Sequence, residues 1–260
     1  MIKRWIITGD THGRVCDRLF QITYDFNVTS PEETAVIILG DAGINYYQNK
    51  TDLRNKQRIS EYGIRVYCVR GNHEVRPENI PGMNTVHDPD VGGVVYIEEA
   101  FPLIRYFVDG GEYMIGDKSV LVIGGAYSVD KYYRLAKACG GFSGWFEDEQ
   151  LSEIEMSAVS EKVRGKKYDV VLTHTAPLDW EPRDLFLTCI DQSTVDKTME
   201  QWLNELKDIF SWNLWCFGHY HASRTEASRV EQFFERAEEL DTLISKWGES
   251  NEKLDEAVIV

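Results

Sequence analysis

Two histidines separated by one residue, His219 and His221, follow an apolar run that ends at Gly218. Imidazole is the most common metal ligand among neutral side chains, so this pair suggests a binding site. Four other segments have a similar form, in which an apolar run gives way to side chains that can bind metals. Those side chains are Asp10 and His12, Asp41, Asn72 and His73, and His174.

Each of these segments has an ordinary structural interpretation when it stands alone. A Gly-Asp pair after a strand usually forms a turn or caps a helix. A single histidine is usually hydrogen-bonded inside the fold. The chain has only six histidines, however, and five of them lie in these segments. Only His87 lies elsewhere, and we interpret it as a surface residue. This coincidence favours one shared site.

The candidate ligands are oxygen and nitrogen donors. Carboxylates, imidazoles and one amide carbonyl suit Mn²⁺, Fe²⁺, Zn²⁺ or Ni²⁺, and they disfavour Cu(I) or an iron–sulfur cluster. Without His73, the candidate ligands number seven, which is more than one ion can use. They suit two cations about 3.5–4 Å apart that share a bridging carboxylate.

The elements that position these side chains are short apolar runs, which we interpret as buried strands. They are "RWIITGD", "TAVIILGD", "IRVYCVRGNHE", "YDVVLTHTAP" and "NLWCFGHYH". Such runs, separated by helical segments, predict a mostly parallel sheet covered on both faces. Ligands of these sheets collect beyond the carboxyl ends of the strands. We expect an extended backbone to point residues i and i+2 toward one centre, and Gly9, Gly40, Gly71 and Gly218 to allow sharp turns there.

The remaining segments complete a single domain over residues 1–260. Residues 94–127 alternate in polarity around glycine turns, which predicts antiparallel hairpins. Helical spacing of apolar residues predicts helices within 147–163 and 195–209. A further apolar stripe predicts an amphipathic C-terminal helix over about 226–247. We expect this helix to pack on the domain rather than bind a partner.

The composition limits the partners that this protein can have. Of 260 residues, 43% are hydrophobic, enough for a sizeable core, and the formal net charge is −15. Such a surface repels long nucleic acid and anionic membranes, because phosphate binding normally needs an excess of Lys and Arg. A small phosphorylated ligand is still compatible with this charge if the site carries its own positive charge.

Two further features predict a cytoplasmic protein. The first apolar run is too short for a signal peptide, and no later run approaches the length of a membrane span. The five cysteines are scattered and form no CxxC pair, which is typical of reduced thiols.

In order along the chain, "GDTHG", "LGDAG", "RGNHE", "LTHTAP" and "FGHYH" resemble the signature of the calcineurin-like metallophosphoesterases. The matches run from Gly9 to His221. The resemblance implies a four-layer α/β/β/α sandwich with two central mixed sheets. It also implies two divalent metal ions, one held by Asp10, His12 and His221, the other by Asn72, His174 and His219, with Asp41 as the bridge. His73 would lie beside the substrate without binding metal.

These roles suggest hydrolysis of a phosphate ester, either a monoester or a diester. The two cations, with Mn²⁺ preferred and Fe, Zn or Ni as alternatives, would convert a shared water to hydroxide near neutral pH. His73 would donate a proton to the leaving oxygen, or form a hydrogen bond with the phosphoryl oxygen. Arg14, Arg70 and Arg134 are candidates for phosphate contacts. The expected substrate is a small phosphorylated molecule or a phosphoprotein.

The sequence departs from the protein Ser/Thr phosphatases of this superfamily. Their second block continues as G-D-x-V-D-R-G, whereas this chain has "GDAGINY" and lacks the second Asp and the Arg. The group that orients His73 is therefore left open. The segment "GGAYSVDKYYR", residues 124–134, resembles one in compact bacterial and phage members, but it indicates no substrate.

Two alternatives differ in class from a general phosphoesterase. A non-catalytic scaffold of the same fold is disfavoured, because scaffolds tend to lose ligands that this chain keeps. A nuclease or a cyclic-nucleotide phosphodiesterase stays open for short substrates. Aromatic residues that could stack on a base are Tyr46, Tyr47, Tyr127, Tyr132 and Trp180.

Overall fold

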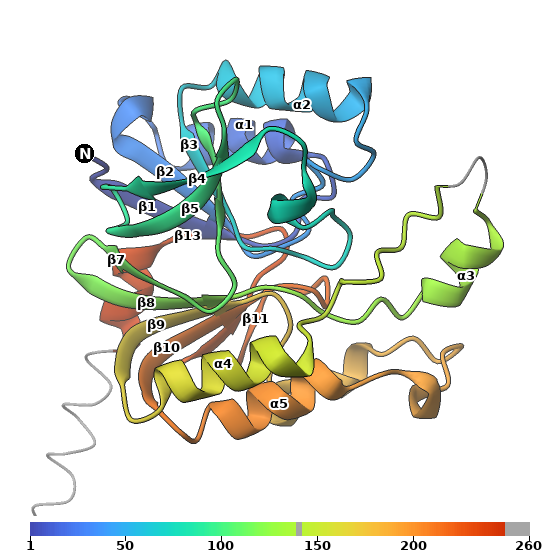
Figure 1. Cartoon of the computed structure of the whole chain (residues 1–260). Helices are drawn as coiled ribbons and strands as arrows, with labels where there is room; N and C mark the ends of the chain where they lie inside the picture. The colour runs from blue at the N-terminus through green and yellow to red at the C-terminus, as the bar shows by residue number, and fades with distance from the viewer. Residues whose placement is uncertain (139–141, 248–260) are drawn as a thin grey trace, which may run out of the picture.

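The computed structural model describes residues 1–138 and 142–247. Two β-sheets lie face to face, and helices cover the outer face of each, so the molecule has four layers in the order α/β/β/α (Figure 1). This arrangement confirms the predicted sandwich.

The first sheet has seven strands in the order β13-β1-β2-β3-β6-β5-β4. Its central strands run parallel, and the outer pairings are antiparallel, so the sheet is mixed. Helices α1 (Val15–Asp25) and α2 (Lys50–Ser60) cover its outer face (Figure 1). The strands are β1 (Arg4–Thr8), β2 (Thr34–Ile38), β3 (Arg65–Cys68), β4 (Met83–Asp88), β5 (Gly93–Glu98), β6 (Ile104–Phe107) and β13 (Ala237–Glu239).

The second sheet has six strands in the order β11-β12-β10-β9-β8-β7. Helices α4 (Glu153–Val163) and α5 (Thr198–Leu206) cover its outer face, within the two segments predicted to be helical. Helix α3 (Lys131–Ala136) projects away from both sheets (Figure 1). The strands are β7 (Gly111–Ile115), β8 (Lys118–Ile123), β9 (Lys167–Thr173), β10 (Ser211–Phe217), β11 (Arg224–Ala227) and β12 (Val230–Gln232).

The continuous apolar runs arise because the central strands are buried on both faces. Neighbouring residues of a strand point to opposite faces. In β1, Ile6 packs under α1 in one apolar cluster, and Ile7 packs between the sheets in another. In β10, Leu214 lies between the sheets, and Trp215 lies beneath α4 and α5. The strands that carry the site are therefore held rigidly from both sides.

The predicted helix over 226–247 is wrong for its first part. Residues 224–239 contain β11, β12 and β13. Within the predicted segment, only residues 240–247 are helical. Short strands separated by turns place apolar residues three or four apart, which imitates a helical stripe. A turn at Arg229, where φ is 65°, separates β11 from β12. The segment closes both sheets, because β12 pairs with β10 and β13 pairs with β1.

Phe233 lies in the chain between β12 and β13. Its side chain is fully buried in the core between the two sheets. Its backbone also lies against Gly9, where any Cβ would overlap the Phe233 carbonyl. We expect Phe233→Ala to lower the free energy of unfolding by about 3–5 kcal/mol, because a large core side chain leaves a cavity.

Urea denaturation measures this change. Ile154→Ala is the matched control, since Ile154 is 82% exposed on α4 and its removal is expected to change stability by about 0.5 kcal/mol or less. Equal effects of the two substitutions would contradict the placement of the C-terminal segment.

Candidate metal centre

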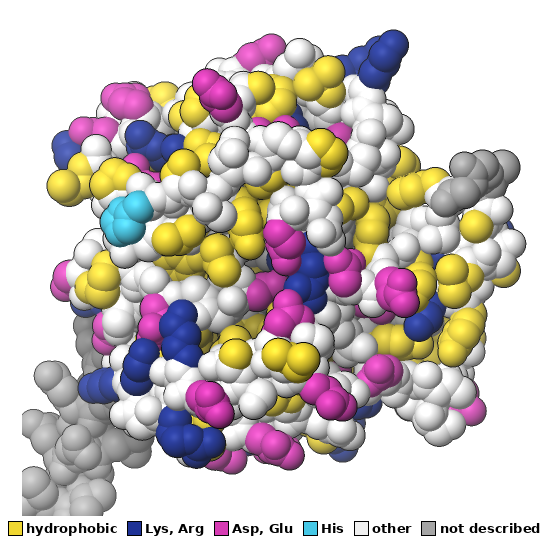
Figure 2. All heavy atoms as spheres, viewed as in Figure 1, with side chains coloured by type: hydrophobic (Ala, Val, Ile, Leu, Met, Phe, Trp, Pro, Cys, Tyr) yellow, Lys and Arg dark blue, Asp and Glu magenta, His cyan; other side chains and the backbone are white. Residues whose placement is uncertain are grey.

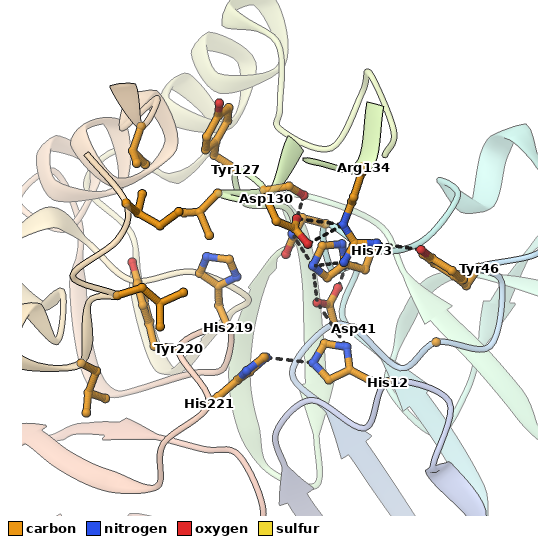
Figure 3. Close-up of a pocket in the computed structure, with 18 of the residues that line it drawn as sticks. His12, Asp41, Tyr46, His73, Tyr127, Asp130, Arg134, His219, Tyr220 and His221 are labelled. Atoms are coloured by element: carbon orange, nitrogen blue, oxygen red, sulfur yellow. Dashed lines mark hydrogen bonds and ion pairs between the residues drawn. The ribbon is translucent and has the colours of Figure 1, made fainter. Parts of the chain in front are cut away.

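The five motif segments meet at one place. Three follow β1, β2 and β3 in the first sheet, and two follow β9 and β10 in the second. Figure 3 shows His12, Asp41, His73, His219 and His221 turned toward a common cavity. The convergence predicted from strand ends is therefore present, and the site lies across the two sheets.

The first group of ligand atoms comes from Asp10, His12 and His221. The Nε2 atoms of His12 and His221 are 2.8 Å apart. Asp10 Oδ2 lies 3.8 Å from His12 Nε2 and 3.5 Å from His221 Nε2. It is buried and has no hydrogen-bond partner within the described residues. A buried carboxylate oxygen facing two imidazole nitrogens fits one divalent cation.

The charges of this first group support the same conclusion. Burial alone would raise the pKa of Asp10, but the nearby imidazoles of His221, His174 and His12 lower it to about 2. The neighbouring Asp10 carboxylate raises the pKa of His221. Asp10 is therefore ionised, as a carboxylate must be to bind a metal ion.

The second group contains His174, Asn72 and His219. His174 Nδ1 lies 2.8 Å from the carbonyl oxygen of Leu39, which can only accept, so a neutral His174 carries its proton there. Its Nε2 then presents a lone pair to Asn72 Oδ1 at 2.8 Å. In that tautomer two acceptors face each other, an arrangement that a cation beside them would stabilise. The ring of His219 lies 5.0 Å from that of His174, and burial lowers the pKa of His219 well below its usual value.

Asp41 lies between the two groups. Its Oδ1 is 3.6 Å from His174 Nε2, and its Oδ2 is 3.8 Å from His12 Nδ1. The backbone N–H of His73 donates to Oδ1 over 2.8 Å and fixes the carboxylate. Asp41 thus lies close to residues of both groups, and the two groups together fit a pair of divalent cations.

The backbone that presents these ligands is not extended, as we had expected from the i, i+2 spacing. His12, Asp41, His219 and His221 have φ values of 45°, 46°, 66° and 52°. Tyr220 N donates to Gly218 O over 2.8 Å, which makes a γ-turn around His219. Tight left-handed turns, rather than strand alternation, bring the imidazoles together. Such positions are costly for non-glycine residues and are typical of functional sites.

The glycines have a different role from the one predicted, except for Gly40. Gly40 has a φ of 92° and packs under the His174 ring. At Gly71 and Gly218, φ is not positive, but a Cβ would overlap Asp41 Oδ1 or Asp10 Oδ1. These two glycines therefore allow close approach of ligand carboxylates instead of sharp turns.

His73 lies beside the metal-ligand groups, with its Nε2 3.9 Å from Asp41 Oδ2. Arg134 Nη2 lies 3.4 Å from the same nitrogen (Figure 3). Asp130 and the hydroxyl of Tyr46 hold the guanidinium of Arg134 in place, at 2.7 Å each. Burial lowers the pKa of His73. Arg134 thus lies beside His73 and is held there by Asp130, whereas His73 Nδ1 has no hydrogen-bond partner among the described residues.

The other two candidate arginines differ in placement. Arg14 lines the cavity, is mostly exposed and pairs with Asp17 at 3.0 Å. The prediction that Arg70 contacts substrate is wrong. Its side chain is buried behind the site, where it pairs with Asp109 at 2.6 Å and donates to the Glu149 carbonyl at 2.7 Å. The sequence position of Arg70, next to Gly71, could not show that its side chain turns inward.

The ligands form the floor of a cavity of about 980 Å³. Tyr46, Tyr47 and Tyr127 line this cavity. The loop before α5 adds the apolar side chains of Leu185, Phe186, Leu187 and Ile190. Trp180 packs against Trp212 and Trp215 instead and does not line this cavity.

Hydrophobic side chains also gather on the projecting segment that carries α3, at the right of Figure 2. Exposed members of this segment are Tyr132, Tyr133 and Leu135. Tyr132 is therefore a surface residue of the projecting segment and not part of the cavity lining described above.

Four residues near the site were missed by sequence reasoning: Ser128, Asp130, Glu149 and Glu200. The only signal for the first two was the segment 124–134, whose resemblance to other family members indicated no role. Glu200 lines the cavity from α5 and is almost fully buried. No motif surrounds it in the sequence.

The comparisons with known proteins agree with this site. The family model described as calcineurin-like phosphoesterase matches residues 3–223, so the chain belongs to the calcineurin-like phosphoesterase family. The family and the Asp/His cluster together support a metal-dependent phosphoesterase.

Two further comparisons add no assignment. The structure is similar to the crystal structure of TT1561 of Thermus thermophilus, with 12% identity, 92% of this chain and 98% of that chain covered, and a TM-score of 0.47. No curated protein sequence matches the chain.

Among the described residues, no helix has the length and apolar character needed to cross a membrane.

Glu200 generates a prediction about pH. Burial raises its pKa to about 7, although Thr175 donates to its Oε1 over 2.7 Å and Lys197 lies nearby. Its unfolded value is 4.5, so the folded state binds the proton more tightly, and stability falls as pH rises from about 4.5 to 7. Glu200→Gln removes this dependence on pH. The free energy of unfolding of the variant minus that of the wild type should therefore increase by about 2 kcal/mol between pH 5 and pH 8.

Urea denaturation of both proteins in EDTA across this pH range measures the difference. A gap between wild type and variant that stays constant with pH would contradict a buried, proton-binding Glu200.

Proposed function

We propose that this protein hydrolyses phosphate esters with the help of two divalent cations, Mn²⁺ being preferred and Fe, Zn or Ni serving as alternatives. The observation that carries the proposal is the pair of 2.8 Å contacts between ligand atoms, His12 with His221 and His174 with Asn72, on either side of Asp41. Bound cations would offset phosphoryl charge and lower the pKa of a water to give a hydroxide nucleophile.

The chain's own residues then supply orientation and proton transfer. Asp41 lies between the two ligand groups and would bind both cations. The hydrogen bond that it accepts from the His73 backbone N–H keeps the imidazole of His73 beside them. We assign His73 as the proton donor to the leaving oxygen. The guanidinium of Arg134, fixed by Asp130, is placed to bind a phosphoryl oxygen, and a charge-assisted hydrogen bond of this kind is strong.

The substrate that we favour is a small phosphate ester, monoester or diester, or a phosphorylated segment of a protein. The aromatic and aliphatic side chains that line the cavity support an organic group attached to phosphorus. The net charge of −15 disfavours long nucleic acid, whereas a nucleotide or a cyclic phosphodiester fits as an alternative. A non-catalytic scaffold is disfavoured because all seven ligands and His73 are gathered in one place.

We also propose that the protein works in the cytoplasm. Cys16, Cys68 and Cys216 are buried as free thiols, and Cys189 is free and exposed, which suits a reducing compartment. The fifth cysteine, Cys139, lies outside the described residues.

Two substitutions separate metal binding from proton transfer. We expect Asp41→Ala to lose bound metal as well as activity, because the bridge between the ligand groups is gone. His73→Ala should keep both metal ions and lose about 10²–10⁴-fold in kcat, the usual contribution of a general acid.

Metal analysis beside a chromogenic phosphodiester assay gives both readouts. Full turnover by a His73→Ala protein that holds two metal ions would rule out the proton-donor role. Full metal content in Asp41→Ala would contradict the bridging position.

Arg134 allows a separate test of phosphate binding. Its hydrogen bonds to a charged oxygen are each worth about 1.5–3 kcal/mol, so Arg134→Ala should lower kcat/KM by about 10- to 100-fold. Lys137→Ala is the control, since Lys137 lies in the same segment and stacks on Tyr133 away from the cavity. Equal kinetics of the two variants would exclude Arg134 from the substrate site.

A further inference from the structure

Ser128 connects the ligand Asn72 to a buried carboxylate. Asn72 Nδ2 donates to Ser128 Oγ over 2.8 Å. Ser128 Oγ in turn lies 2.5 Å from Glu149 Oε2, and the backbone N–H of Ser128 donates to Glu149 Oε1 over 3.0 Å. Asn72, Ser128 and Glu149 are 1%, 1% and 3% exposed. The chain of hydrogen bonds is therefore shielded from water, and its partners are fixed.

The direction of these hydrogen bonds follows from elementary chemistry. An ionised carboxylate can only accept, so the single hydrogen of the Ser128 hydroxyl points to Glu149. The hydroxyl oxygen can then only accept from Asn72, which requires that the amide nitrogen of Asn72 faces Ser128. Its carbonyl oxygen must face the other way, toward His174 Nε2.

Among the described residues, the other neighbours of the Asn72 amide are His73 Nε2, at 3.3 Å, and His174 Nε2, and each of them donates or accepts depending on its tautomer. An amide turned by 180° would present an NH₂ group to the second metal site, and such a group cannot bind a cation. The orientation of Asn72 is thus essential for that site.

We propose that Ser128 and Glu149 are positioning residues that set the direction of the Asn72 amide and so complete the second metal site. The inference rests on the proposed function, because it assumes that Asn72 binds a cation. It gives a role to the segment 124–134, which supplies Ser128, and to the loop before α4, which supplies Glu149.

Isothermal titration with Mn²⁺ alone tests the proposal. Ser128→Ala and Glu149→Gln should weaken the second Mn²⁺ site by about 10- to 100-fold, as expected when a residue supporting a metal ligand is lost. Ser128→Thr keeps the hydroxyl and should keep most of the affinity. The matched control is Ser119→Ala, since Ser119, near the start of β8, donates its N–H and its hydroxyl to one carboxylate, that of Asp169 on β9. It should leave both sites unchanged.

A reversal of polarity gives the sharpest test. In Asn72→Asp, two carboxylates compete for the one hydroxyl hydrogen of Ser128. Adding Glu149→Gln lets the new amide donate to Ser128 Oγ, whose hydrogen then points to the new carboxylate at position 72. Glu149→Gln should therefore weaken the second Mn²⁺ site in the wild-type background and strengthen it in the Asn72→Asp background. A loss of folding cannot produce this change of sign.

The outcomes are distinct. The proposal is overturned if Glu149→Gln weakens the second site in both backgrounds, if Ser128→Ala binds Mn²⁺ like Ser119→Ala, or if the wild type binds fewer than two Mn²⁺. A wild type that binds two Mn²⁺ but hydrolyses no ester would contradict the proposed function alone.

Discussion

Hydrogen-bond acceptors that face one another without a donor between them are the constraint on which this site depends. Asn72 Oδ1 and His174 Nε2 lie 2.8 Å apart, and Asp10 Oδ2 is buried without a partner among the described residues. In the dry interior such an arrangement is unfavourable, because acceptors repel and a carboxylate loses its hydration. Divalent cations remove both costs. The fold holds the acceptors in this arrangement with covered strands on both sides, so binding a cation requires little rearrangement.

Backbone contacts between the two sheets keep the arrangement in place. His219 N, after β10, donates to Asp10 Oδ1, after β1, over 3.0 Å. Leu39 O, at the end of β2, holds the ring of His174 from β9. Asp10 and His174 are thus each oriented by a backbone group from the other sheet. The cost of such close packing is visible in two features. Several ligand residues have positive φ values, and at Gly71 and Gly218 any Cβ would overlap a ligand carboxylate. Burial of the central strands on both faces offsets that cost.

The sequence predicted the parts of the site that are attached directly to strand ends. Parallel strands place their carboxyl ends together, so Asp10, Asp41, Asn72 and His219 could be assigned to one place. The sandwich and its mixed sheets were predicted from the family resemblance. What failed depends on tertiary packing. The inward turn of Arg70 is set by Asp109, and the strands within 224–239 are set by pairing with β10 and β1. Ser128 and Glu149 could not be found either, because serine and glutamate have no distinctive pattern until the fold brings them to Asn72.

The most direct test of this account is an anomalous difference map of crystals grown with Mn²⁺. The account predicts two peaks about 3.5–4 Å apart, one among Asp10, His12 and His221 and the other among Asn72, His174 and His219, with the Asp41 carboxylate contacting both. A single peak, or peaks away from these side chains, would contradict it.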